Sequence, residues 1–202
     1  MRLAQYLKAA AAKAVGKRAT LAPTIDIRKP LEEAAQQVAK EGGATPEWIT
    51  LAAPLVERFE GMAKLIPGNK VKAYPDPATG GKPWTIGVGS TTDESGNAIK
   101  PSDIWTVDRA RKRFMAHLAE FGEQVDHLLG DTPTTPAQKA ALTSLAYNVG
   151  AANLARSSLL RRHKEGKHDA AAKEFGKWVF ANGRKMNGLV RRREAEKALY
   201  SS

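Results

Sequence analysis

The chain contains no cysteine, which excludes disulfide bonds and metal sites built from thiolates. It also lacks any apolar run close to the roughly 18 residues that a membrane-spanning helix needs. Aromatic residues make up only 6% of its 202 residues, but apolar residues together make up 42%. That share supports a sizeable core, so we expect a globular chain with one domain, or with one domain and an appendage.

Acidic residues are scarce in the last quarter of the chain. The formal net charge is +11. Residues 151–202 contain 13 Lys/Arg and 5 Asp/Glu, whereas residues 51–150 contain 11 of each. A basic region predicts an anionic partner, such as nucleic acid, an anionic membrane surface or an anionic polymer, or else a solvated face that aids solubility. Charge alone does not choose among these.

Residues 1–50 carry no motif that assigns a function. Their first stretch is basic and rich in alanine, and Lys8 and Lys13 interrupt its apolar part. This is a poor match to the apolar segment of a secretory signal, so we expect a product made in the cytoplasm without a standard signal peptide. Helices are predicted at residues 2–15 and 30–41, which would form an N-terminal helical extension of unknown role.

The patterns in the rest of the chain predict an α+β architecture. A helix is expected over Thr45–Phe59, capped by its first residue, with Glu60 at or near its end because Gly61 follows. Residues 62–100 are rich in turn-forming residues and predict two or three short antiparallel strands. We therefore expect a small β-rich lobe there and a larger helical lobe at about 104–202. Its helices are predicted at residues 106–129 (capped by Thr106), 135–149, 157–165, 168–180 and 188–200.

The segment Trp84–Gly89 predicts a strand with one bare face. Alternate residues of a strand point to opposite sides. Its apolar residues would pack inward, and the opposite face would hold Thr85, Gly87 and Gly89. Glycine inside a strand often marks close approach by a ligand or by another backbone. A bulge or a tight strand crossing is the alternative explanation.

Two carboxyl groups precede this strand. Glycoside hydrolysis needs one protonated carboxyl group, which gives a proton to the leaving oxygen, and one ionised group, which activates water or attacks carbon. Glu60 follows Phe59 on the helix side, where partial desolvation would favour the acid, whereas Asp76 lies in a polar turn. The residues alone indicate Glu60 as acid and Asp76 as base, but they do not single out this pair among other carboxylates.

Six short motifs occur in an order that resembles the phage-type lysozymes of glycoside hydrolase family 24, the endolysins of double-stranded DNA phages. The resemblance covers residues from about 55 to 200 and implies a lysozyme-like fold, with an active-site cleft between the lobes of a muramidase domain at 51–202. The motifs are FEG at 59–61, AYPDP at 73–77, WTIGVGST at 84–91, AYNVG at 146–150, RSSLLRR at 156–162 and NGRKMNGLVRRREAE at 182–196.

The resemblance implies hydrolysis of the β-1,4 bond between N-acetylmuramic acid and N-acetylglucosamine in peptidoglycan, with inversion, for lysis of the host cell. It makes Glu60 the proton donor, Asp76 the water-activating carboxylate and Thr85 a residue that places the water. It implies no metal and no cofactor. The resemblance also implies that the substrate contacts Gly87, Gly89, Thr91, Tyr147, Asn148 and Ser158. For Tyr147, Asn148 and Ser158, a plain packing role is left open.

The expected partners follow from the same resemblance. They are the glycan strands of peptidoglycan, reached through a pore-forming holin, and the protein is expected to be a monomer. Residues Arg191–Arg193 are expected to point outward from the last helix and to attract an anionic cell surface. One alternative is a catalytically inactive module that binds peptidoglycan. Another is a nucleic-acid binder, although no recognition-helix, finger or stacking-platform signature accompanies the basic charge.

Overall fold

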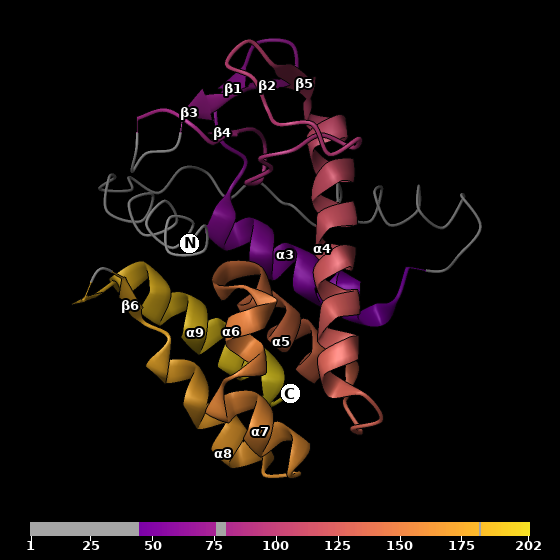
Figure 1. Ribbon diagram of the computed structural model, residues 1–202, viewed down its shortest axis with the longest axis vertical. Helices are drawn as coiled ribbons and strands as arrows, with labels where there is room; N and C mark the ends of the chain where they lie inside the picture. Colours follow the sequence, from indigo (N-terminus) through magenta and orange to yellow (C-terminus); the bar gives the residue numbers. More distant parts are fainter. Residues whose placement is uncertain (1–44, 76–79, 182) are drawn as a thin grey trace.

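The computed structural model describes residues 45–75, 80–181 and 183–202. Within them the chain forms two lobes, and Figure 1 shows strands β1–β5 at one end, helices α7 and α8 at the other, and α4 running beside both. The helices are α3 (Glu47–Glu60), α4 (Val107–Leu129), α5 (Pro136–Val149), α6 (Ala151–Ala155), α7 (Ser158–Lys164), α8 (His168–Glu174), η1 (Phe175–Lys177) and α9 (Asn187–Tyr200). The strands are β1 (Leu65–Ile66), β2 (Lys70–Lys72), β3 (Tyr74–Pro75), β4 (Trp84–Thr85), β5 (Ile104–Thr106), β6 (Phe180–Ala181) and β7 (Arg184–Lys185).

The helical lobe is built around α5. Every residue of this helix from Ala140 to Val149 is buried, and α3, α4 and α9 all pack against it. Its first turn is fixed by a capping box, in which Thr135 and Gln138 each bond to the other's backbone N–H. A helix buried on every side needs no amphipathic stripe, so α5 forms the centre of the lobe.

Helices α3 and α4 pack closely because one of them carries a glycine at the contact. A Cβ atom added at Gly122 of α4 would lie 2.1 Å from the Trp48 ring of α3, so only glycine leaves room for the indole. Thr106 caps α4 by accepting a hydrogen bond from the Arg109 N–H at 3.1 Å. This cap fixes the point where the β lobe passes into the long helix.

The β lobe contains two small antiparallel sheets. The larger sheet has three strands in the order β1-β2-β5, and in it Val71 lies opposite Trp105. Both side chains are buried in the core of the lobe with Ile86 and Ile99. Strands β3 and β4 form a separate pair, with Tyr74 opposite Thr85. A third pair, β6–β7, lies in the helical lobe just before α9.

The two-lobed α+β prediction is confirmed, as are the helix starts at Thr106 and Thr135. The predicted cap of α3 is wrong, because Pro46 precedes the helix and no side chain caps it. The predicted helix 168–180 is too long: α8 ends at Glu174, and a short 3-10 turn and β6 follow. The helices predicted at 2–15 and 30–41 lie outside the described residues.

Candidate active site

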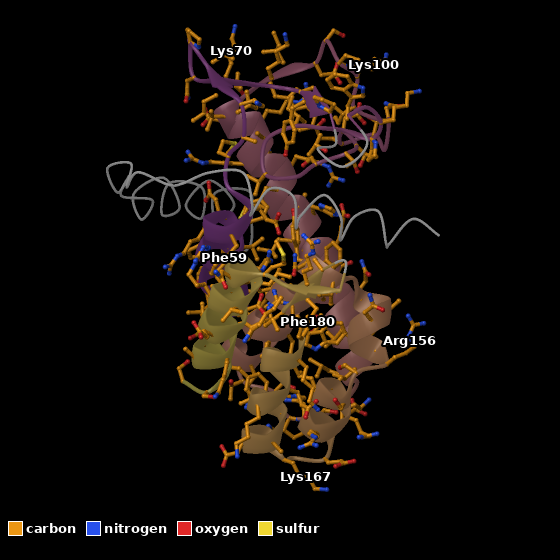
Figure 2. All side chains as sticks on the ribbon, turned by 90° about the vertical axis from the view of Figure 1, so that its left-hand side faces the viewer. Phe59, Lys70, Lys100, Arg156, Lys167 and Phe180 are labelled. Carbon is orange, nitrogen blue, oxygen red and sulfur yellow. The ribbon has the colours of Figure 1, made fainter. Side chains whose placement is uncertain are left out.

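Glu60 is the last residue of α3, and its carboxylate contacts α9. The helix ends there because Gly61 turns the chain with φ +69°. Arg192 Nη1 donates a hydrogen bond to Glu60 Oε1 at 2.6 Å. The Glu60 side chain is 15% exposed and that of Arg192 is 4% exposed. In Figure 2 the neighbouring Phe59 lies between the two ends of the molecule, which Lys70 and Lys167 mark. Glu60 is therefore a partly buried carboxylate with a charged partner.

Arg192 belongs to a group of buried charges that we call the α9 charge cluster: Arg192, Arg193 and Glu196. Glu196 Oε1 accepts hydrogen bonds from Arg192 Nε at 3.0 Å, Arg193 Nη2 at 3.0 Å and Ser144 Oγ at 2.7 Å. Arg192 Nη2 also donates to the Ser144 carbonyl at 3.2 Å. Buried charges need such partners because desolvation is costly, and here each arginine has a carboxylate within reach.

The pKa values of the two arginines move in opposite directions. Burial acting alone would lower the pKa of Arg192, but the Glu60 and Glu196 carboxylates outweigh it and raise that pKa. Burial lowers the pKa of Arg193 to about 10 in spite of Glu196. Both side chains still carry their positive charge at neutral pH.

The expectation that Arg191–Arg193 all point outward is wrong for two of the three residues. Arg191 is exposed, whereas Arg192 and Arg193 are buried against α5 and Glu196. Asn148 of α5 takes part in this burial, because its Oδ1 accepts a hydrogen bond from Arg193 Nη2 at 3.1 Å. This contact supports the packing role that the sequence left open for Asn148.

A second glutamate lies on the same helix. Burial raises the pKa of Glu57, and Arg111 of α4 opposes this rise. Arg111 Nε lies 3.8 Å from Glu57 Oε1. The two glutamates therefore have different partners: Glu57 meets α4 and Glu60 meets α9.

Thr85 lies in β4, opposite Tyr74 of β3. The next residue after β3 is Asp76, which lies outside the described residues, so its role stays a prediction. The backbone connects this hairpin to the end of α3, since the Ala63 N–H donates to the Gly87 carbonyl at 3.2 Å. Thr85 thus lies two residues before Gly87, which bonds to the chain segment that follows Glu60.

The predicted strand Trp84–Gly89 is wrong beyond Thr85. The chain turns back at 87–89, and Ile86 pairs with Ser90, because Gly87 and Gly89 have φ values of +60° and +88°. A Cβ atom on Gly87 would lie 2.7 Å from Ala110 Cβ of α4. Close packing on α4 therefore accounts for this glycine.

The turn also changes the argument for Thr91. An unbroken strand would put Thr91 on the same face as Thr85, because alternate residues share a side, but β4 ends at Thr85. Thr91 accepts a backbone hydrogen bond from the Ile99 N–H at 3.0 Å. Contacts of Gly89 and Thr91 with substrate stay predictions.

The remaining predicted contacts have protein partners. Tyr147 is buried, and its hydroxyl donates to the Val88 carbonyl at 3.2 Å, which joins α5 to the β-lobe turn. Ser158, the first residue of α7, donates to the buried Glu174 carboxylate of α8. Tyr147 therefore packs between the lobes, while Ser158 holds α7 to α8.

The reading of the sequence missed Glu196 and the buried state of Arg192 and Arg193. A signal was present, since Glu196 follows the arginines by four and three residues, the spacing of ion pairs on one helix face. Such spacing is equally common on exposed helices. The burial comes from the packing of α9 on α5, whose Ser144 and Asn148 accept hydrogen bonds from the two arginines. Arg192 also reaches Glu60, 132 residues away in the sequence.

The chain is similar to known proteins over most of its length. The family model for phage lysozymes matches residues 59–196. An endolysin of Bacillus phage B103 is 37% identical over 146 residues, which are 72% of this chain and 51% of that protein. An endolysin of Acyrthosiphon pisum secondary endosymbiont phage 1 is 35% identical over 155 residues, 73% of this chain and 93% of that protein. The chain thus spans about half the length of the first relative and nearly all of the second.

Solved structures with the same fold include an endolysin from Escherichia coli O157:H7 phage FAHEc1, with a TM-score of 0.63 and 26% identity over 77% of this chain and 91% of that one. The muramidase domain of SpmX from Asticaccaulis excentricus has a TM-score of 0.62 and 29% identity over 75% of this chain and 95% of that one. The expected lysozyme-like fold is confirmed. No helix among the described residues is both long and apolar enough to cross a membrane.

Proposed function

Because the chain belongs to the phage lysozyme family, we propose that it is an endolysin that hydrolyses the β-1,4 bond between N-acetylmuramic acid and N-acetylglucosamine in peptidoglycan. The observation that carries the proposal is the partly buried Glu60 carboxylate at the end of α3, bonded to Arg192 and located within the matched region. A carboxyl group shielded from water, yet not fully buried, suits transfer of a proton to a substrate.

The proposed reaction uses two carboxyl groups. Glu60 gives its proton to the leaving glycosidic oxygen as the bond from the anomeric carbon to that oxygen breaks. Asp76 takes a proton from a water molecule, whose oxygen forms the new bond to the anomeric carbon, and Thr85 helps to place that water. With water between them the carboxyl groups of an inverting enzyme lie ~6.5–9.5 Å apart, whereas direct attack by Asp76 would need ~5 Å.

Arg192 has a defined part in this reaction. Once Glu60 has lost its proton, it is a carboxylate, and the Arg192 guanidinium 2.6 Å away stabilises that charge. The product state of the proton transfer is therefore stabilised by a partner that the fold already holds in place.

The test is Glu60→Gln, with Glu57→Gln as the matched control. The control removes a carboxylate of similar exposure, 13% against 15%, from the same helix. Release of reducing ends from purified peptidoglycan should fall by a factor of about 10²–10⁴ in Glu60→Gln and by only a few-fold in Glu57→Gln. Circular dichroism should show both variants folded.

Each other outcome has a definite meaning. Wild-type rates in Glu60→Gln would refute the assignment, and loss confined to Glu57→Gln would move the proton donor to that residue. A wild-type protein that binds peptidoglycan but releases no reducing ends would be the inactive binding module instead.

We further propose that the protein acts as a monomer and that exposed cations of its C-terminal quarter attract it to an anionic cell surface. Three cations support the attraction to an anionic surface, because each is exposed: Arg161, Lys173 and Arg191. Access to the wall through a holin belongs to the same proposal and is supported by the endolysin relatives alone.

A further inference from the structure

Arg192 uses all three edges of its guanidinium group. Nε donates to Glu196 at 3.0 Å, Nη2 to the Ser144 carbonyl at 3.2 Å and Nη1 to Glu60 at 2.6 Å. The group is planar and its donors have a fixed fork geometry. Two bonds on the buried side therefore determine where Nη1 points, and Nη1 is the donor that meets Glu60.

Glu196 is the centre of that buried side. Its side chain has no exposed surface, and it accepts hydrogen bonds from both arginines and from Ser144 of α5. Arg192 donates to both carboxylates, so it links Glu196 to Glu60.

The charge count near Glu60 depends on Glu196. Arg192 and Arg193 contribute two positive charges and Glu196 one negative charge, so the cluster carries +1 with Glu196 ionised and +2 without that charge. Helix α5 adds no other charge here, because its single charged residue, Lys139, pairs with Asp126. The other charged residues of α3 are Glu47 in its first turn and Glu57 and Arg58 near its end, and Arg111 of α4 lies beside Glu57.

We propose that Glu196 is a positioning residue for the proton donor: through Arg192 it sets both the direction of the hydrogen bond to Glu60 and the net charge that Glu60 experiences. The inference rests on the proposed function, because it assumes that Glu60 gives the proton. Without the Glu196 charge, the arginines favour the ionised form of Glu60 more strongly. The enzyme would then lose its protonated donor at a lower pH.

The test is the pH profile of kcat/KM for Glu196→Gln, with a soluble peptidoglycan fragment as substrate. The alkaline limb of this profile reports deprotonation of the essential acid in the free enzyme. We expect the limb to move by about one pH unit or more toward acid, since two charges ~12 Å apart already produce about one unit at an effective dielectric constant of about 20. At the pH optimum, kcat/KM should fall about tenfold or more, because the donor is misplaced.

Glu174→Gln is the matched control. Glu174 is also a buried carboxylate of the helical lobe, but it pairs with Lys177 and Arg162 instead of the α9 charge cluster. Both variants should unfold more easily than the wild type, and only Glu196→Gln should move the alkaline limb. A limb that stays in place in folded Glu196→Gln, or that moves equally in both variants, would overturn the inference.

A conservative variant covers the case in which Glu196→Gln does not fold. Glu196→Asp keeps the charge but withdraws the carboxylate by one methylene group from Arg192. The limb should stay in place while kcat/KM falls about tenfold through lost orientation, and an unchanged kcat/KM would overturn the inference. If Glu60→Gln is inactive and Glu196 variants behave as wild type, only this inference fails. If Glu60→Gln is active, the proposed function fails.

Discussion

Gly87 occupies a position that no other residue fits without strain. Its φ of +60° is unfavourable for residues with a Cβ atom, and a Cβ here would lie 2.7 Å from Ala110 Cβ. Both atoms belong to tightly packed parts of the chain, so neither moves easily. The glycine thus sets how closely the β-lobe turn approaches α4.

We predict that Gly87→Ala is much more destabilising than Gly96→Ala. Gly96 has a similar φ of +80° but open space around the added Cβ, so its variant carries only the backbone strain of about 1 kcal/mol. Overpacking adds about 1–3 kcal/mol at Gly87. Urea denaturation of both variants measures the difference. Equal losses of unfolding free energy would show that contact with Ala110 costs nothing.

Single residues were predictable where their roles depend on near neighbours in the chain. Glu60 was placed at a helix end because Gly61 follows, and Thr106 was identified as a cap from its position before an apolar pattern. The burial of Arg192 and Arg193 was not predictable in this way. It depends on Glu60, Ser144 and Asn148, which come together with α9 only in the folded lobe.

Helices α7, α8 and α9 meet at a buried histidine. The ring of His163 lies with Nδ1 2.6 Å from the Tyr200 hydroxyl and Nε2 2.9 Å from Thr134 Oγ1. The Thr134 hydroxyl donates to the Thr132 carbonyl, so its oxygen accepts from Nε2–H, and Nδ1 accepts from Tyr200. Burial raises the pKa of Tyr200 to about 12, which keeps its hydroxyl protonated.

This arrangement suits only the neutral imidazole. Burial, with a smaller contribution from the nearby His168, lowers the pKa of His163 to about 4. The ordinary value is about 6.5, so the unfolded chain binds this proton more readily than the folded one. Its contribution to stability is complete above about pH 6.5 and is lost as the pH falls from there toward about 4.

We predict that His163→Gln removes this pH dependence. The free energy of unfolding of the wild type should fall more steeply than that of the variant between pH 6.5 and 4. Gln keeps a donor near the position of Nε2, so the bond to Thr134 is retained in a side chain that does not titrate. Chemical denaturation at half-unit steps of pH measures both curves. Parallel curves across that window would contradict the prediction.

The starts of helices were predicted well where capping residues mark them. The ends of helices and strands were predicted poorly where packing or a glycine determines them. The capping residues of α4 and α5 fixed their starts. Strand β4 ends after two residues because the following glycines take positive φ. The apolar residues 178–180 continue a helical pattern in the sequence, yet the chain there enters the β6–β7 hairpin, which only the lobe's packing selects.

Charge is distributed unevenly over the whole molecule, and part of it is internal. Two of the C-terminal arginines are buried, so they contribute little to attraction at a distance. The exposed cations of this quarter remain, and Arg161, Lys173 and Lys185 are three of them. Attraction between surfaces depends on ionic strength, since the screening length is about 30 Å at 0.01 M salt and about 8 Å at 0.15 M.

We predict that replacing Arg161, Lys173 and Lys185 together with Gln lowers the rate of cell-wall lysis more at low salt than at high salt. Turbidity loss of a wall suspension at the two ionic strengths gives the measurement. The control replaces three exposed cations of the β lobe, Lys64, Lys70 and Lys72. An equal effect in both triple variants would assign the salt dependence to total charge instead of to the C-terminal quarter.

The enclosed position of α5 has a consequence for how this chain tolerates change. Ten consecutive buried residues leave no site there for a tag, a dye or an inserted loop. In a library of random variants, most substitutions at these ten positions should impair folding, whereas the turn around Ser95 should accept most replacements. Substitutions that accumulate among relatives should therefore lie outside this helix, against which α3, α4, α6 and α9 all pack.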